Sequence, residues 1–263
     1  MPHQPTLLAL PACLALGCSL ATDLSSLDGA DASSEAAPPD SSASDSAALD
    51  AGFDVTDGAD ASSAVVSNVQ IGSMAFIANG GSVTATLPTA SSSGTLLVAT
   101  VTCDLTTATV GAPSGWSLAI TGTGFANGSS IWYANQGGVS SATFTSSNGG
   151  AIAAQLSEWS GVTKVDQTGT ASTPSATASV TVSTSGALTA GGELAVTTYG
   201  QATGQQSLIT YTPGAGWTAL GATATTRMHY TADYRVGAGP GAISETVTSS
   251  VAATWVAVIA TFK

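Results

Sequence analysis

The stretch Gly-Thr-Leu-Leu-Val-Ala at residues 94–99 returns as Gly-Glu-Leu-Ala-Val-Thr at residues 192–197. After each copy, a turn containing proline and glycine leads into a tryptophan, Trp116 in the first case and Trp217 in the second. Landmarks that recur in the same order are the signature of an internal duplication. The pattern therefore predicts that one structural unit is used twice.

The duplication covers most of the chain after its first quarter. Tyr133 and Tyr234 follow the two tryptophans at the same spacing, and the offset between the copies drifts only by an amount that one longer loop would give. We place the two repeats at about residues 70–160 and 165–262.

Composition excludes several classes of protein. Only 8% of the 263 residues are charged, whereas a long helical protein would use far more Glu, Lys and Arg. Ten of the sixteen acidic residues precede residue 64, and the rest of the chain is nearly neutral with six acidic and four basic residues. So few cations cannot form a basic stripe, so we do not expect a nucleic acid partner.

Apolar residues recur mostly with a period of two, which indicates strands rather than helices. In the first repeat we expect strands over residues 74–77, 83–87, 96–102, 116–120, 130–134, 142–145 and 152–159. In the second we expect them over residues 178–182, 193–199, 208–211, 217–220, 228–236, 243–248 and 254–262. The sequence Asn79-Gly80-Gly81 predicts a hairpin turn between the first two strands.

Short strands separated by Gly, Asn and Pro turns predict an all-β fold. We expect a jelly-roll-like antiparallel β-sandwich, built from the two repeats, over residues 64–263. The closing strand at residues 254–262 is so apolar that it needs cover on both faces. This favours one pseudo-symmetric sandwich, while two small immunoglobulin-like domains in tandem are the alternative.

Residues 1–18 have the form of a signal peptide, because the apolar run from Leu7 to Leu20 is too short to span a membrane. The run contains Leu-Ala-Leu-Gly-Cys-Ser at residues 14–19, which resembles the lipobox of bacterial lipoproteins. The resemblance implies an exported protein whose Cys18 is acylated, anchored in the outer membrane or at the cell surface. A plain signal peptide that is cut nearby is the alternative.

Residues 19–63 are rich in Asp, Ser, Ala, Gly and Pro, and such a segment buries too little apolar surface to become ordered. As a flexible coil it would span roughly 35–40 Å. The stretch Asp54-Val55-Thr56-Asp57-Gly58 lacks the ligand spacing of an EF-hand, so we expect no calcium site. Similar spacers follow the acylated cysteine of bacterial surface lipoproteins, and we interpret this one as a disordered tether.

The body after the tether also resembles a known kind of module. Its motifs are Gly-x-Leu-x-Val, Pro-x-Gly-Trp, an aromatic strand, a Thr-rich strand and an Ala-rich strand ending in Glu-Trp-Ser-Gly-Val at residues 158–162. This order is similar to β-sandwich modules of secreted bacterial proteins and phage structural proteins. The resemblance implies an adhesion or carbohydrate-binding module, and we expect no cofactor.

Candidate catalytic groups are few. His229 is the only histidine outside the leader and no Gly-x-Ser-x-Gly elbow accompanies it, so we interpret it as a solvated strand residue. Glu158 could meet Asp104 or Asp166 as the opposed carboxylates that a glycosidase needs. Cys103 ends an apolar run and is interpreted as a buried, inert thiol. One histidine and one distant cysteine cannot form a zinc site, so no metal is expected.

The aromatic residues that recur in both repeats are predicted to pack. Trp116 and Trp217 stand at matched positions, and so do Tyr133 and Tyr234. Both halves of a duplication must fill the same core, so recurrence favours a packing role over a binding role.

Residues that do not recur supply the candidate binding surface. If the two matched tyrosines point inward, period two directs Trp132, Asp233 and Arg235 outward. An outward tryptophan is a platform for a sugar ring, and Tyr199 and Tyr211 could join it. The alternative for Trp132 is a sheet-face residue that a loop covers.

Three hypotheses of function follow. The first is a non-enzymatic, membrane-anchored surface module that binds a glycan or another surface polymer. The second is a structural module of the cell envelope without a small ligand, and the third is a glycoside hydrolase-like enzyme. The sequence favours the first and leaves the oligomeric state open.

Overall fold

The structure of the protein is a computed structural model. It describes residues 65–263 except for residues 105–108, 125–126, 203–208 and 225–227. The predicted signal peptide with Cys18 and the predicted tether at residues 19–63 lie outside the described residues. Within the described part the regular elements are β-strands, and no helix there is long and apolar enough to cross a membrane.

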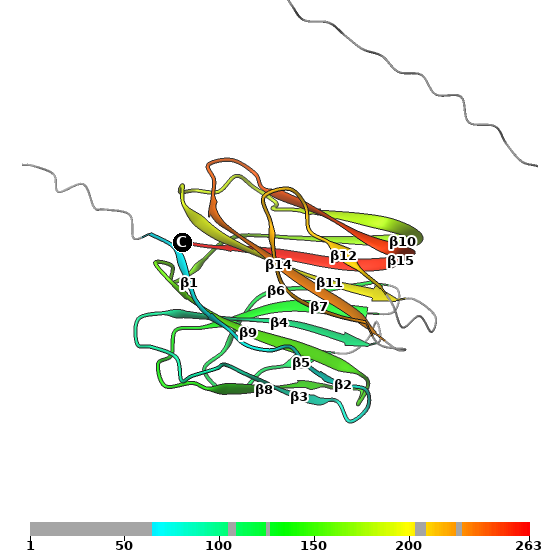
Figure 1. Cartoon of the computed structure of the whole chain (residues 1–263), viewed down its shortest axis with the longest axis horizontal. Coiled ribbons are helices and arrows are strands. Elements are labelled where there is room, and N and C mark those ends of the chain that lie inside the picture. Colours follow the sequence, from blue (N-terminus) through cyan, green and yellow to red (C-terminus); the bar gives the residue numbers. More distant parts are fainter. Residues whose placement is uncertain (1–64, 105–108, 125–126, 203–208, 225–227) are drawn as a thin grey trace, which may run out of the picture. The chain divides into compact units, whose positions relative to one another are not determined.

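The first repeat folds as two facing antiparallel sheets (Figure 1). The main sheet has the order β1 (Ser67–Ile71), β9 (Ile152–Ser160), β4 (Leu96–Asp104), β7 (Asn127–Ala134) and β6 (Ser117–Thr123), and β2 (Ala75–Ile77) also pairs with β9. The cover sheet has the order β3 (Ser82–Thr86), β8 (Ser141–Ser146) and β5 (Val110–Gly111). Apolar side chains from both sheets meet in a core between them.

The second repeat uses the same strand order. Its main sheet runs β10 (Val165–Ser183), β15 (Ser244–Phe262), β11 (Glu193–Ala202), β14 (His229–Ala238) and β13 (Thr218–Ala224), and β12 (Tyr211–Thr212) pairs with β15. The long strands β10 and β15 shift register between Thr173 and Ser179, so they pair in two arms. The arm of residues 179–183 and 244–248 packs over β11, in the place that the cover sheet has in the first repeat.

Burial follows the period of two that the sequence predicts. In β3 and β8 buried and exposed residues alternate, as in a sheet with one solvated face. The closing strand β9 is buried along almost its whole length, because the cover sheet lies on one face and the second repeat on the other. The closing half of β15 is covered in the same way. The predicted all-β antiparallel fold built from two repeats is therefore confirmed.

The recurring tryptophan motif is a turn of fixed geometry. The N–H groups of Trp116 and Trp217 each donate to the carbonyl oxygen three residues earlier, at 3.3 and 3.0 Å. The preceding glycines, Gly115 and Gly216, have φ values of 86° and 80°, a left-handed conformation that glycine adopts without strain. Both tryptophans then pack against the core of their own repeat, which confirms the predicted packing role.

The two repeats pack through their main sheets, and their contacts are symmetric. Strand register makes Trp159 and Phe262 equivalent, just as Tyr133 and Tyr234 are. The ring of Tyr133 meets Phe262 edge-on with centroids 5.9 Å apart, and Tyr234 meets Trp159 at 4.9 Å. The first repeat is thus a two-sheet sandwich, the second repeat folds the arm of one long sheet over itself, and the two repeats share a third core with pseudo-two-fold symmetric contacts.

Two local expectations differ from the structure. The turn at Asn79-Gly80-Gly81 does not close a hairpin, because β2 pairs with β9 while β3 pairs with β8 in the other sheet. The turn instead carries the chain from the main sheet to the cover sheet. Strands β1 and β5 and the first part of β10, residues 165–177, are not among the predicted strands, because β1 and this part of β10 are mostly polar and β5 is only two residues long.

Candidate functional site

Trp132 stands in the wall of an open hollow of about 190 Å³, here called the tryptophan hollow. The hollow is lined by Thr109, Val110, Leu118, Thr121, Thr123, Ser130 and Trp132. The indole is half-buried against the core of the first repeat, and its Nε1 donates to Ser130 Oγ at 3.0 Å. The neighbouring Leu118 is 45% exposed, so an apolar surface with two bulky side chains faces the solvent here.

The hollow exists because the two sheets of the first repeat differ in width. The main sheet continues through β7 to β6, whereas in the described residues the cover sheet has three strands. No residue of β6 contributes to the described core beneath the cover sheet. The face of β6 and β7 that would meet a wider cover sheet is therefore left partly open, with Trp132 at its border.

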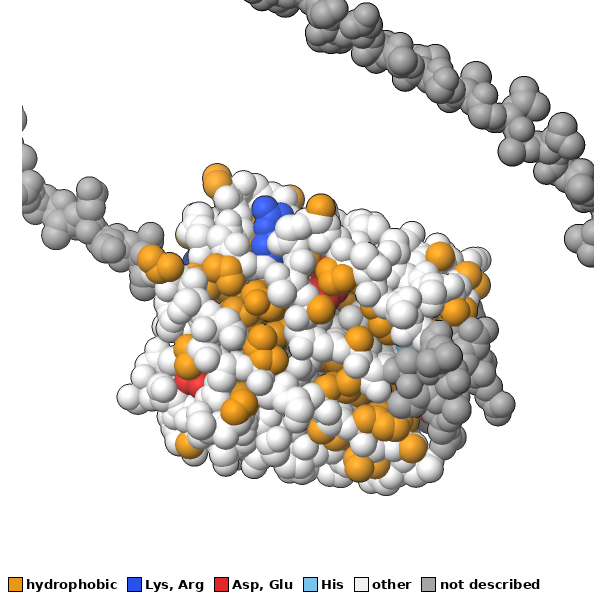
Figure 2. Space-filling view, in the orientation of Figure 1, with side chains coloured by type: hydrophobic (Ala, Val, Ile, Leu, Met, Phe, Trp, Pro, Cys, Tyr) orange, Lys and Arg blue, Asp and Glu red, His pale blue; other side chains and the backbone are white. Residues whose placement is uncertain are grey.

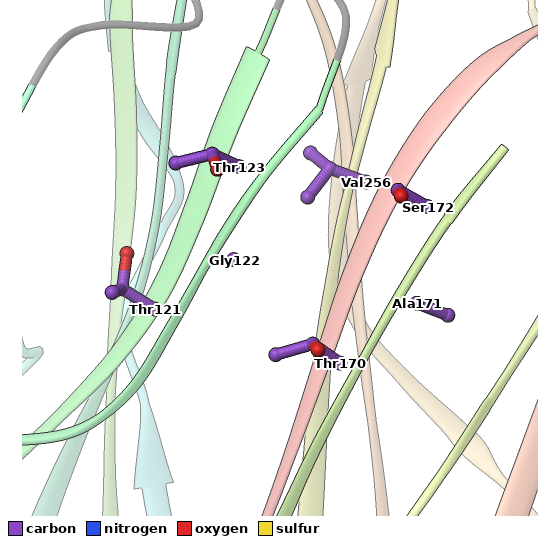
Figure 3. Close-up of a pocket in the computed structure, with 7 residues that line it drawn as sticks. All are labelled: Thr121, Gly122, Thr123, Thr170, Ala171, Ser172 and Val256. Atoms are coloured by element: carbon purple, nitrogen blue, oxygen red, sulfur yellow. The ribbon is translucent and has the colours of Figure 1, made fainter. Parts of the chain in front are cut away.

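A second hollow of about 320 Å³, the junction hollow, lies where the repeats meet. It is lined by Thr121, Gly122, Thr123, Thr170, Ala171, Ser172 and Val256. In Figure 3, Thr170 and Val256 project from the second repeat toward β6 at Gly122, while Thr121 and Thr123 leave β6 on the opposite side. These two threonines line both hollows, so β6 forms a ridge between them.

The described residues that line the two hollows are all uncharged. The lining consists of threonine and serine hydroxyl groups, the apolar side chains of Leu118, Trp132 and two valines, and the small residues Gly122 and Ala171. Figure 2 shows that charged side chains are also sparse over one face of the molecule. Such a surface can stack on apolar faces and exchange hydrogen bonds with hydroxyl groups, but it cannot bind a ligand through charge.

The predicted outward direction of Asp233 is wrong. Register places Asp233 where the first repeat has Trp132, and the side chain of Asp233 is 0% exposed. Period two correctly separates these residues from Tyr133 and Tyr234. However, the tyrosine face packs on the other repeat, and the opposite face looks into the interior of its own sandwich.

The other residues of the predicted platform also lie in the second repeat. Tyr199 is fully buried, and Arg235 and Tyr211 are half-buried. The hydroxyl of Tyr211 donates to Gln201 Oε1 at 3.0 Å. None of them lines either hollow, so the structure does not bring the five predicted residues together.

Asp233 belongs to a buried polar cluster. Glu245 Oε2 accepts hydrogen bonds from Tyr199 Oη at 2.8 Å and from the Thr197 hydroxyl. Both carboxyl oxygens of Asp233 and the Oε1 of Glu245 have no donor among the described residues. Two buried carboxyl groups that face each other cannot both be charged, because desolvation and mutual repulsion oppose it.

Burial, followed by the charge of Glu245, raises the pKa of Asp233. Burial also raises the pKa of Glu245, against hydrogen bonds from Thr197 and Tyr199 that lower it. The pKa of Tyr199 is raised by burial and by the same carboxyl groups. A proton held between Asp233 and Glu245 satisfies two of the three bare oxygens. Neither hollow reaches this pair, so it is part of the interior and not of the candidate site.

The carboxylates considered for a glycosidase are not brought together. Asp104 ends β4 seven positions beyond Leu97, the partner of Glu158, which is about 23 Å along a strand. Burial would raise the pKa of Glu158, but hydrogen bonds from Gln70, Thr95 and Ser92 outweigh it and lower the pKa.

Asp166 is likewise held by other partners. It accepts hydrogen bonds from Thr189 and forms an ion pair with Lys263. Burial opposes the charged form, yet these partners lower the pKa of Asp166 well below its usual range. Neither Glu158 nor Asp166 therefore has the raised pKa that a catalytic acid needs at neutral pH.

His229 is also placed differently from the expectation. The ring is 0% exposed rather than solvated, and neither of its nitrogens has a hydrogen-bond partner among the described residues. Burial lowers its pKa, so the ring is neutral at pH 7. Cys103 is buried with a free thiol, as expected. Across the described ranges, no three His, Cys, Asp or Glu side chains gather to hold a metal ion.

Sequence reasoning found Trp132 but missed the residues around it. The lining threonines and Leu118 come from β6, and Thr170 and Ser172 come from a strand of the other repeat. No local pattern marks them, because the hollows arise from sheet width and repeat packing. Comparison of the chain with protein-family models, with curated proteins and with solved structures finds no match.

Proposed function

We propose that the protein is a non-enzymatic binding module of the cell surface that holds an uncharged carbohydrate in the tryptophan hollow. The observation that carries the proposal is the half-buried Trp132 in the wall of an open, charge-free hollow lined by hydroxyl groups. Aromatic faces stack on the apolar faces of sugar rings, and neutral hydroxyl groups orient the ring by hydrogen bonds.

The shape of the hollow supports recognition of a ring. Leu118 and Val110 supply further apolar surface beside the indole. The hydrogen bond from Trp132 Nε1 to Ser130 fixes the indole before a ligand arrives, which lowers the entropy cost of binding. Thr109, Thr121 and Thr123 present hydroxyl groups around the same space.

Binding rather than catalysis also fits the acidic residues. Glycoside hydrolysis needs one protonated and one ionised carboxyl group on either side of the bond to be cut. The carboxyl pair that carries a proton, Asp233 with Glu245, is buried away from both hollows. The charged Glu158 and Asp166 are held by structural hydrogen bonds instead.

The N-terminal sequence supports the cellular place of this module. The lipobox-like residues 14–19 and the acidic residues 19–63 are the arrangement of a lipid anchor followed by a spacer. We include in the proposal that Cys18 is acylated and that the membrane is a partner through this lipid. Metabolic labelling with palmitate tests it: the label should be lost in Cys18→Ser, and a label that persists contradicts the anchor.

The binding proposal is tested with Trp132→Ala in affinity chromatography on neutral polysaccharides. We expect the wild-type chain to be retained and the variant to elute in the void. Trp116→Ala is the matched control, because Trp116 packs against the same core with its ring 5.6 Å from Phe144 but lines neither hollow. Thermal unfolding of both variants separates lost binding from lost folding. Retention of a folded Trp132→Ala protein would refute the proposal.

A further inference from the structure

We infer that the ligand is a linear, uncharged polysaccharide whose chain crosses β6 and occupies the tryptophan hollow and the junction hollow together. This inference rests on the proposed function and extends it from one sugar ring to a chain. The two hollows adjoin, since Thr121 and Thr123 line both of them. The strand between them is the last of its sheet, so its outer edge is not paired to another described strand.

The sizes of the two hollows favour a ligand that uses both. Pockets that hold a small molecule usually enclose roughly 300–1,000 Å³. The tryptophan hollow, at about 190 Å³, lies below this range, and the junction hollow, at about 320 Å³, lies at its lower end. A single sugar therefore buries little surface in the tryptophan hollow, whereas a chain that spans the ridge adds the contacts of the junction hollow without a second binding event.

The junction hollow belongs to one side of the pseudo-two-fold axis. There Gly122 lets the repeats approach so closely that an added Cβ would lie 2.7 Å from Val258 Cγ1. At the equivalent place on the other side, Gln155 stands where the second repeat has Val258. Its Nε2 donates to Gly72 O and Leu220 O, both at 2.9 Å, so an amide bridges the repeats there.

The chemistry of the lining selects the class of polymer. Thr170 and Ser172 are exposed on the far side of the junction hollow, and Thr121 and Thr123 are exposed on the ridge. A chain that crosses β6 meets hydroxyl groups on both sides and, among the described lining residues, no charged side chain. Anionic polysaccharides and nucleic acids find no cation here, so neutral glycans fit best.

A peptide strand added to the free edge of β6 is the competing occupant. Strand addition needs a regular, flat edge, and β6 has a register shift between Leu118 and Ile120 that bends it. The edge is also short, because β6 spans only Ser117–Thr123. These features favour a ligand that lies across the strand over one that lies along it.

The test measures how affinity depends on the length of the ligand. The probes are neutral oligosaccharides of one to eight sugars, in glucose, mannose and N-acetylglucosamine series, titrated into the full chain by calorimetry. For the series that binds, we expect affinity to rise by at least about tenfold once the chain spans both hollows, which corresponds to about 1.4 kcal/mol. Thr170→Val combined with Ser172→Ala should remove this gain and leave the binding of short oligosaccharides unchanged.

A matched control uses hydroxyl groups far from both hollows. Thr181→Val with Thr246→Val removes an exposed pair on the outer face of the second repeat, where the two Oγ1 atoms lie 2.6 Å apart. This control should keep the full gain with length. Short sugars that bind through Trp132 without any gain in longer chains would overturn the inference and leave the proposed function standing. Binding of no neutral sugar would overturn both, and capture of extended peptides instead would assign the edge to strand addition.

Discussion

The interiors of the two repeats differ more than their frameworks do. The first repeat pairs Ala99 with Trp132 at the positions where the second pairs Thr197 with Asp233. Strand order and most of the register are the same in both copies. One strand framework thus accepts either an apolar or a polar filling between its sheets.

The polar filling works because its members form a set. Glu245 stands where the first repeat has Ala142, and it comes from a strand that is distant in sequence from its partners. Its donors Thr197 and Tyr199 replace Ala99 and Val101. A buried carboxyl group without such donors would cost several kcal/mol. The comparison teaches that these residues can only be exchanged together.

A smaller exchange of the same kind occurs at the sheet ends. In the first repeat Glu158 of β9 accepts hydrogen bonds from Thr95 and from the N–H of Ser92. In the second repeat the two residue types are exchanged between positions. The acidic residue, Glu193, lies on β11, and the residue with the hydroxyl group, Thr261, lies beside it on β15. The N–H of Ala190 donates to Glu193, as that of Ser92 does to Glu158. In both copies one carboxylate therefore accepts a hydrogen bond from an N–H group of the loop that leads into β4 or β11.

The largest effect is expected when a single carboxyl group of this polar set is introduced at the equivalent position of the first repeat without its partners. Ala142→Glu would place a carboxyl group in the apolar interior of the first repeat, where Ala99 and Val101 offer no donor. We expect the free energy of unfolding in urea to fall by about 4 kcal/mol or more. Ala142→Met, of similar volume, is the control and should lose about 1–3 kcal/mol by overpacking alone. Equal losses in the two variants would contradict the argument.

The next effect concerns the shared core between the repeats. Trp159 and Phe262 are fully buried at equivalent positions. Each change to alanine should cost about 3–5 kcal/mol, measured by denaturant unfolding. Since the core belongs to both repeats, each variant should unfold both in one transition. Two separate transitions would show that the repeats are independent.

A pH-dependent effect should distinguish the second repeat from the first. The folded-state pKa of Asp233 is raised by burial and Glu245, so above about pH 4 the folded protein binds more protons than the unfolded chain. Stability from this group is therefore full at acid pH and is lost as pH rises. Asp233→Asn should remove this pH-dependent loss, so between pH 5 and pH 8 its free energy of unfolding should exceed that of the wild type by about 1–3 kcal/mol.

The groups that face Asp233 set the control for this experiment. They are Glu245 from β15 and Tyr199 from β11, and both have raised pKa values. Asp166 has a lowered pKa, so its contribution has the opposite sign, present above about pH 4 and lost in acid. Asp166→Asn should therefore lose stability at neutral pH, and its difference from the wild type should shrink as the pH falls below about 4. A pH-independent difference for Asp233→Asn would contradict the shared proton.

The smallest effect is expected when Thr95 and Glu158 exchange residue types, as their equivalents do in the second repeat. Thr95→Glu and Glu158→Thr should each destabilise the protein, and the double variant should recover about 1 kcal/mol relative to the sum of the two. A double-mutant cycle in urea measures this coupling. Strictly additive losses would mean that the two arrangements are not interchangeable.

Much of the fold could be predicted from the sequence because its signals are local. Alternation in residues such as Val83 and Phe144, and the matched turns before Trp116 and Trp217, mark strands and repeats directly. β1 was missed because a strand at a sheet edge needs little apolar sequence. The candidate site was only partly predictable, since the cover over Trp132 depends on how many strands the cover sheet has.

The polar interior could not be predicted for a related reason. The sequence shows that Asp233 replaces Trp132, but not that Glu245 faces it from another strand. Period two separates the two faces of a strand without saying which one meets solvent. Here both faces of β14 are covered along its first part, so the expectation that Asp233 points outward was wrong, and exposed residues begin only at Val236.

The crossed contacts of Tyr133 with Phe262 and of Tyr234 with Trp159 have a consequence for how the chain can vary. They are the isologous contacts of a homodimer, joined here within one polypeptide. In a true dimer every substitution appears on both sides of the interface. Covalent fusion removes that constraint, so one copy can hold a glutamine bridge while the other keeps an open cleft, and stoichiometry no longer depends on concentration.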